Sequence, residues 1–353
     1  MQPMQGCLVQ LKPGLKPSNI EALNPERKTA MPTRRLPPQN IQLLLIDPQN
    51  DFCDLPPDWC PVDPLSGQAI APALPVTGAH ADMLRLADLI RQGADGISAI
   101  TLTLDAHHRF DIAHPTFWQT GAGGMSSAGD AGGTNDAGGK SGTSGAGSTS
   151  GAGGLVAPFT SITAAQVRAS SFAPKDPAML PRALAYLDEL ERRARYTLMV
   201  WPVHCEIGSW GQAIHPALKA ACNGWEERHL AVAQKVSKGS NPWTEHYSAL
   251  QAEVPDADDA ATQLNRTLIT DLDRADLILI GGEASSHCVR ATTEHLVDNL
   301  PSGQLSKLVL LTDCMSPVGG FEAQHREFLA DMARRGLRLA TSAEMLPALL
   351  ANA

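Results

Sequence analysis

The 353-residue sequence lacks any long apolar run, and its net charge is acidic rather than basic. No stretch reaches the roughly eighteen consecutive apolar residues of a membrane span, and residues 1–39 lack the apolar core of a secretory signal. A formal charge of −9 gives no basic surface that would attract a nucleic-acid backbone. These absences argue against a membrane or nucleic-acid partner, and they predict a cytoplasmic protein.

Cysteine is also scarce, and its seven copies stand at irregular spacing. An odd number of scattered cysteines in a long chain does not make a disulfide framework, so we expect reduced thiols. A hydrophobic content of 43% with 18% charged residues is ordinary for a globular protein. The composition therefore predicts a chain able to bury a sizeable core.

Two segments contain little that could be buried. Residues 1–39 are rich in Pro, Lys and Arg without helical or strand periodicity, and residues 120–154 consist mostly of Gly, Ser, Ala and Thr. Ordering such segments costs conformational entropy without apolar burial in return. We predict a disordered tail at 1–39, and a single domain at 40–353 that carries a flexible Gly-rich insertion at 120–154.

Elsewhere, short apolar runs alternate with longer amphipathic stretches. The expected strands are 42–46, 97–104, 196–201, 230–236, 277–281 and 307–311. The expected helices lie at about 79–92, 180–195, 213–226, 287–300 and 320–335. Continuous Leu, Ile and Val runs are typical of strands buried on both faces. The alternation predicts a three-layer α/β/α fold with a mostly parallel six-stranded sheet.

Polar residues follow five of these strands directly. In open α/β sheets, ligands bind beyond the carboxyl ends of the strands, so these residues are the candidates for a site. Two strands are followed by acids, Asp47 and Asp105, and His107 comes two residues after Asp105. The other three are followed by the histidine His204, the cation Lys238 and the thiol Cys288.

Cys288 lies between a buried strand and the first turn of a helix. The unpaired N–H groups of a helix N-terminus favour a thiolate, although a small residue packing the turn is an equal alternative. Considered alone, Asp47 has the alternative interpretation of a turn former, and Lys238 that of a solvated lysine at the end of a strand. Together they offer the acid that takes a thiol proton and the cation that holds a thiolate, as a nucleophilic cysteine requires.

The segment TLDAHHRFDIAHP concentrates imidazole and carboxylate groups. Asp105 and His107 could bind one side of a divalent ion, with His204 as a third ligand; zinc, iron and manganese suit such donors. The alternative is a polar loop whose histidines are exposed. His114 is a further candidate ligand, and His108 competes with it for that place.

The motifs resemble those of the cysteine hydrolase (isochorismatase-like) superfamily, and most closely those of nicotinamidases. The matching segments are IDPQNDF, TLDAHH, WPVHCEIGSWGQAIHPAL, the KG pair at Lys238 and GGEASSHCVRAT. They cover most of residues 40–340, apart from the insertion and a lengthened stretch around 53–78. The WPVHC segment and the Asp-x-His loop are the parts that favour nicotinamidases over other members.

The resemblance implies an isochorismatase-like, Rossmann-like fold with a catalytic triad, one divalent metal ion, a cis peptide and a slot for an aromatic ring. The residues implied are Asp47, Lys238 and Cys288 for the triad, Asp105, His107 and His204 for the metal, Ala284 after the cis peptide, and Phe52 and Trp201 for the slot. We expect the backbone N–H groups of Ala284 and Cys288 to form an oxyanion hole.

The predicted function is hydrolysis of a small-molecule aromatic carboxamide through a cysteine thioester. Nicotinamide would give nicotinate and ammonia, a step in pyridine-nucleotide salvage. One alternative is a metal-free hydrolase of the same fold that acts on another amide or carbamoyl substrate. Others are a non-catalytic member of the fold and a zinc hydrolase that uses metal-bound water. A homo-oligomer is compatible with each of these alternatives.

Overall fold

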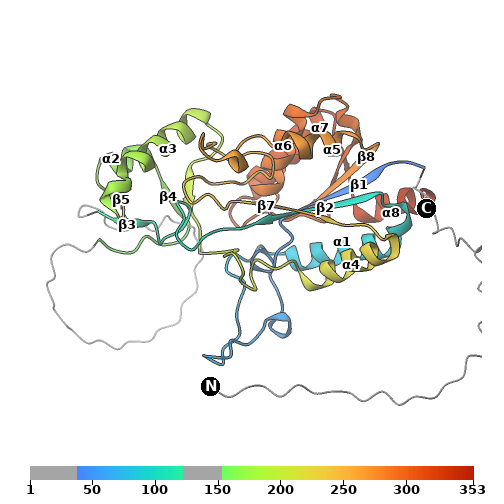
Figure 1. Ribbon diagram of the computed structural model, residues 1–353, viewed down its shortest axis with the longest axis horizontal. Coiled ribbons are helices and arrows are strands. Elements are labelled where there is room, and N and C mark those ends of the chain that lie inside the picture. The colour runs from blue at the N-terminus through green and yellow to red at the C-terminus, as the bar shows by residue number, and fades with distance from the viewer. Residues whose placement is uncertain (1–37, 122–152) are drawn as a thin grey trace, which may run out of the picture. The chain divides into compact units, whose positions relative to one another are not determined.

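The computed structural model describes residues 38–121 and 153–353, and its central element is a six-stranded sheet (Figure 1). Neighbouring strands all run parallel, in the order β10-β9-β8-β1-β2-β7. The strands are β1 (Ile41–Ile46), β2 (Ala99–Asp105), β7 (Gln234–Lys238), β8 (Leu277–Gly282), β9 (Leu308–Leu311) and β10 (Arg338–Ala340). The predicted α/β fold with a parallel six-stranded sheet is confirmed.

Helices cover both faces of this sheet, with α1, α4 and α8 on one side and α5, α6 and α7 on the other (Figure 1). Their bounds are α1 (Ala79–Gly93), α4 (Pro216–His229), α5 (Arg266–Asp273), α6 (Cys288–Asn299), α7 (Glu322–Arg334) and α8 (Ser342–Ala351). In α1, the buried residues Ala79, Met83, Leu86 and Ile90 recur every three or four positions and form one apolar stripe. Because both faces are covered, the central strands carry continuous apolar runs.

One of the six predicted strands is not part of this sheet. Residues 196–201 were expected to form a member of it, but only β6 (Leu198–Val200) forms there, and it pairs antiparallel with β4 (Thr160–Ile162). The sixth place belongs to β10, which pairs with β9 at the edge. β10 has only three residues, which are exposed or half-buried, so it carries no apolar run to reveal it.

A smaller layer of structure lies beside the sheet and has its own hydrophobic cluster, which includes Phe117, Trp118 and Leu187. It consists of the β4–β6 ribbon, a second antiparallel ribbon and two helices: β3 (Trp118–Thr120), β5 (Phe172–Pro174), α2 (Ala164–Arg168) and α3 (Leu180–Arg193). This layer positions two segments of the candidate site. His114 lies just before β3, and Trp201 directly follows β6.

The predicted tail and insertion lie almost wholly outside the described residues. At the edge of the tail, the Gln39 backbone N–H donates to Asn352 Oδ1 at 2.8 Å. At the edges of the insertion, the Thr120 N–H donates to the Gly154 carbonyl at 2.9 Å. The two ends of the insertion are therefore held next to each other. Over 38–121 and 153–353, no helix is long and apolar enough to cross a membrane.

Candidate functional site

Four strands deliver polar side chains to one edge of the sheet. Asp47 follows β1, Asp105 ends β2, Lys238 ends β7, and Cys288 begins α6 shortly after β8. These four strands are parallel neighbours, so their carboxyl ends meet at the same edge. His204 arrives from the segment after β6, outside the sheet. The structure thus brings together all five strand-end positions that the sequence predicted.

Lys238 lies at the centre of a buried ionic group. Its Nζ is 2.9 Å from Asp47 Oδ2, 2.9 Å from Asp105 Oδ1 and 3.6 Å from Cys288 Sγ. All four side chains are buried. The next residue, Gly239, has a left-handed φ of 88°, and a Cβ there would lie 2.9 Å from Asp105 Oδ1. Glycine at this position therefore lets the backbone turn closely around the carboxylate.

Burial sets the protonation of the thiol and of the neighbouring acid. It raises the pKa of the Cys288 thiol well above its ordinary value, and Lys238 opposes this only in part. Burial also raises the pKa of Asp47, again against the pull of Lys238. The helix N-terminus alone therefore does not make Cys288 a thiolate. The resting site pairs a protonated thiol with a carboxyl group of raised pKa, which suits proton exchange between them.

Asp105 and Lys238 remain charged for the opposite reason. Burial disfavours both charges, but His107 and Lys238 outweigh it and hold the pKa of Asp105 well below its ordinary value. Asp105 and Asp47 likewise hold the pKa of Lys238 well above its usual range. Thr103 adds a hydrogen bond of 2.5 Å to Asp47 Oδ1. The ionic group is thus fixed by mutual pairing in a place that water hardly reaches.

The loop between β8 and α6 presents two backbone donors beside the thiol. The peptide between Glu283 and Ala284 is cis, as the resemblance implied. Within the part of the chain that the structure describes, neither the Ala284 N–H nor the Cys288 N–H donates to a protein acceptor. Gly282 has φ 120°, and a Cβ there would lie 2.0 Å from the Ile46 carbonyl oxygen. Only a glycine allows the backbone to leave β8 this close to the Ile46 carbonyl oxygen.

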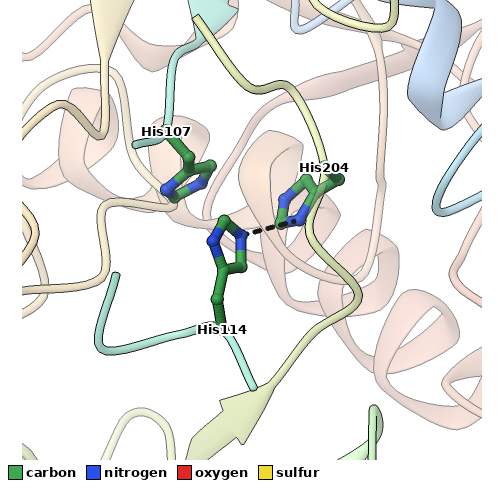
Figure 2. A group of neighbouring side chains, drawn as sticks. All are labelled: His107, His114 and His204. Atoms are coloured by element: carbon green, nitrogen blue, oxygen red, sulfur yellow. Dashed lines mark hydrogen bonds between the residues drawn. The ribbon is translucent and has the colours of Figure 1, made fainter. Parts of the chain in front are cut away.

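Three histidine rings face one another beside this group (Figure 2). They belong to His107, which follows β2, to His114 of the same loop, and to His204, which follows β6. One ligand atom from each lies within 4.8 Å of the others. Asp105 Oδ2 lies 3.0 Å from His107 Nε2 and 3.4 Å from His204 Nε2, and His114 Nε2 lies 3.4 Å from His204 Nδ1.

The distances from Asp105 Oδ2 to Nε2 of His107 and to Nε2 of His204 fit a divalent ion, whereas His204 Nδ1, the atom near His114, lies 2.8 Å from the Pro202 carbonyl oxygen. Two ligands of a tetrahedral zinc ion, each at about 2.0–2.1 Å from it, lie roughly 3.4 Å apart. The remaining ring nitrogens have partners that orient them: His107 Nδ1 lies 3.1 Å from Asp111 Oδ2, and His114 Nδ1 lies 3.2 Å from the His108 carbonyl oxygen. Such outer partners are typical of metal-binding histidines. The group could therefore hold one ion.

The two candidates for a further ligand lie differently. His114 is fully buried in the cluster, whereas the His108 side chain is exposed and only its backbone oxygen reaches the group. Burial and the neighbouring histidines lower the pKa of His114 to about 2, so its ring is neutral, whereas Asp105 and Asp111 overcome burial and raise the pKa of His107 well above its ordinary value. The structure thus favours His114 over His108.

A narrow cavity opens onto the Cys288 thiol and onto His204 of the histidine cluster. Phe52 and Trp201, the predicted walls of a ring slot, both line it, together with Leu74, Asp105, His204, Glu245, Tyr247, Ala284, His287, Cys288 and Val318. Its free volume of about 20 Å³ accommodates little more than one water molecule. A ring-shaped ligand can therefore enter only when the lining side chains move apart.

Several residues of the site were not predicted from the sequence. Glu245 and His287 line the cavity, and Asp51 accepts the Cys205 N–H at 2.7 Å next to His204. Thr103 could have been found, because Thr101, Thr103 and Asp105 place a polar residue at every second position of an otherwise apolar strand. Glu245 lies in an irregular loop, where no periodicity indicates it.

Comparison with known proteins gives likeness in structure alone. No family model and no curated protein matches the sequence. A nicotinamidase/pyrazinamidase of Acinetobacter baumanii has a similar structure, with a TM-score of 0.50, 18% identity and coverage of 87% of this chain and 99% of that one. The yeast nicotinamidase bound to the inhibitor nicotinaldehyde also has a TM-score of 0.50, with 16% identity and 85% and 99% coverage. The chain therefore has the nicotinamidase fold.

Proposed function

We propose that the protein is a metal-assisted cysteine amidohydrolase that cleaves a small aromatic carboxamide, with nicotinamide as the first candidate substrate. The observation that carries the proposal is the position of Lys238 Nζ, 2.9 Å from Asp47 and 3.6 Å from Cys288 Sγ, at a cavity with aromatic walls. The likeness of the fold to two solved nicotinamidase structures supports the proposal.

In the first half of the reaction, Asp47 takes the thiol proton of Cys288 while the sulfur forms a bond to the carboxamide carbon. The carbonyl π electrons move to the oxygen, which the backbone N–H groups of Ala284 and Cys288 hold. The proton on Asp47 then passes to the amide nitrogen. The C–N bond breaks, ammonia leaves, and a thioester remains on Cys288.

In the second half, water replaces ammonia in the cavity. Asp47 takes one proton from this water as its oxygen attacks the thioester carbon. The C–S bond then breaks, the proton on Asp47 returns to the sulfur, and a carboxylic acid is released. Lys238 lies within reach of both anions that form during the cycle, the Cys288 thiolate and the Asp47 carboxylate, and it stabilises them without transferring a proton.

The histidine cluster would orient the substrate. Asp105, His107, His114 and His204 would hold one zinc, iron or manganese ion, which when bound supplies a Lewis acid for the ring nitrogen of nicotinamide. Phe52 and Trp201 would enclose the ring on either side. The carboxamide would then lie toward Cys288, and ring amides with a suitably placed nitrogen would be favoured.

The test measures ammonia released from nicotinamide by the wild type and by Cys288→Ala, with metal quantified in both samples. We expect activity to fall by about 10³-fold or more while bound metal is unchanged, because only the nucleophile is removed. Cys222→Ala is the matched control: this cysteine is also buried, but it lies on α4 and outside the site. Its activity should stay close to that of the wild type.

Other outcomes would replace the proposal. Full activity in Cys288→Ala would favour a hydrolase that uses metal-bound water. Activity on other amides or carbamoyl compounds without bound metal would favour a metal-free hydrolase. A wild-type protein that neither turns over amides nor reacts with iodoacetamide at Cys288 would favour a non-catalytic member of the fold. Nicotinaldehyde, the inhibitor in the yeast structure, provides an independent probe of the site.

A further inference from the structure

Glu283 is a buried carboxyl group directly before Ala284, one of the two proposed oxyanion donors. It is fully buried, and its backbone N–H donates to the Ile46 carbonyl at 2.8 Å. Its Oε2 accepts the Ser316 backbone N–H at 3.1 Å. The strand-to-helix loop is therefore fastened on one side to the end of β1, and on the other to the segment that follows β9.

Asp82 on α1 reaches the same serine. Its Oδ2 accepts the Ser316 hydroxyl at 2.6 Å, and its Oδ1 pairs with Arg85. Two carboxyl groups that bind the same half-buried serine cannot both ionise at low cost. Asp82 is the member with a cationic partner, so Glu283 is the member that keeps its proton. A side-chain hydrogen bond between the Glu283 and Asp82 carboxyl groups also favours the protonated form of Glu283.

The charges around Glu283 agree with a neutral side chain. Burial, and then the charge of Asp82, raise its pKa well above the ordinary value. Asp54 adds a further negative charge, and the neighbouring Cys53 is an uncharged thiol whose pKa burial raises. Among Asp54, Asp82, Arg85 and Glu283, only Arg85 is a cation, and it already pairs with Asp82.

The rest of the loop is fastened to the same region. The Ser285 N–H donates to the Ser316 carbonyl at 2.9 Å, and the Ser285 hydroxyl lies 2.8 Å from His325 Nδ1 on α7. Ser286 Oγ accepts the Val318 N–H at 3.1 Å. Each polar side chain between Glu283 and Ser286 thus binds the segment after β9 or the helix that follows it. Cys288 comes two residues later.

We infer that Glu283 is a positioning residue for the oxyanion hole: its carboxyl group holds Ser316 and thereby fixes the Ala284 and Cys288 N–H groups toward the reacting carbonyl. This inference rests on the proposed function. A group that acts on the oxyanion affects tetrahedral adducts more than flat ligands, because only the adduct carries a charged oxygen at that place. The experiment therefore compares how a substitution changes the affinity for a ligand that forms a tetrahedral adduct and the affinity for a flat ligand.

Nicotinaldehyde and nicotinate provide the two ligands. With the aldehyde, the thiol proton passes to Asp47, the Cys288 sulfur bonds to the aldehyde carbon, and the carbonyl π electrons become an oxyanion. Nicotinate binds without forming this bond. We compare E283Q, which keeps an uncharged acceptor for Ser316, with E283M, which has a similar volume but no acceptor. E283L is a second apolar variant, in case E283M does not fold.

We expect E283M to raise the inhibition constant of nicotinaldehyde by about 10- to 100-fold, with an equal fall in kcat, since a displaced donor loses part of its effect. Nicotinate affinity should change less than about threefold, and E283Q should resemble the wild type. Leu349→Ala controls for general destabilisation, because Leu349 is a fully buried residue of α8 outside the site.

An unchanged inhibition constant of nicotinaldehyde in folded E283M or E283L would overturn the inference alone, and so would an E283Q variant as impaired as E283M. A parallel loss of nicotinate affinity would also overturn it, because it would indicate a purely structural role. If nicotinaldehyde does not inhibit the wild type, the proposed function fails as well, and this result is distinct from the others.

Discussion

Replacing Lys238 by methionine tests the buried ionic group directly. The ammonium lies 2.9 Å from a carboxylate oxygen of Asp47 and 2.9 Å from one of Asp105, and water is excluded from all three. Removing one partner of a buried ion pair costs about 3–5 kcal/mol, because the remaining charge stays buried and unpaired. We expect Lys238→Met to lower the free energy of unfolding by this amount at pH 7.

The loss should depend on pH in a defined direction. Without Lys238, a carboxyl group of the pair binds its proton more tightly in the folded than in the unfolded chain. The folded variant is then favoured below the unfolded pKa, about 4, and loses stability as the pH rises above it. The difference between wild type and Lys238→Met should therefore be smallest near pH 4 and should grow toward pH 7.

Urea unfolding followed by circular dichroism, in buffer with EDTA, measures both effects. Lys219→Met is the matched control, because Lys219 is an exposed lysine of α4, and its loss should change stability by less than about 0.5 kcal/mol. A cost below about 1 kcal/mol for Lys238→Met, or a cost that is the same at pH 4 and pH 7, would refute the reasoning.

Three further predictions concern the same end of the sheet. Thr103→Val removes the hydrogen bond to the Asp47 carboxylate, so urea unfolding should show a loss of about 1.5–3 kcal/mol. Gly282→Ala would place a Cβ 2.0 Å from the Ile46 oxygen at φ 120°, so we expect a strongly lowered melting temperature or no soluble protein. Glu283→Gln removes a carboxyl group whose folded pKa is raised, so its stability relative to the wild type should rise from pH 4.5 upward, by up to about 1.4 kcal/mol per unit. Unfolding curves at pH 5 and pH 7 check this, and a constant difference would contradict it.

Much of the central sheet could be predicted from sequence because its strands are buried on both faces. β1 and β8 consist mainly of Leu and Ile, a pattern typical of strands that are buried on both faces, and a polar residue follows each of them. The order in which the strands lie could not be predicted in this way. The three-residue β10 is paired at an edge and is half exposed, so apolar periodicity does not mark it.

The candidate site was predictable where a side chain follows a strand, and less so where a loop supplies it. Asp47 and Lys238 stand at fixed places relative to the sheet. Glu245 reaches the cavity through a loop whose path depends on tertiary packing. The choice between His114 and His108 also depends on that packing, because the sequence places both in one polar segment.

The burial of Glu283 could not be predicted from the sequence, for a different reason. A glutamate between a buried strand and the helix that begins at Cys288 looks in the sequence like an exposed turn residue. Its burial follows from Asp82 and Ser316, which lie about two hundred residues away on one side and thirty-three on the other. Only the packed structure brings the three together.

The hydrogen bond between the Thr120 N–H and the Gly154 carbonyl has a practical use. The backbone segments on either side of residues 122–152 approach each other to 2.9 Å, between the Thr120 nitrogen and the Gly154 oxygen. The domain therefore fixes the distance between the two ends of this segment, whatever the number of residues in it. A short turn could replace the segment, and a reporter domain with adjacent termini could be inserted there. The fold thus offers an attachment point within the chain.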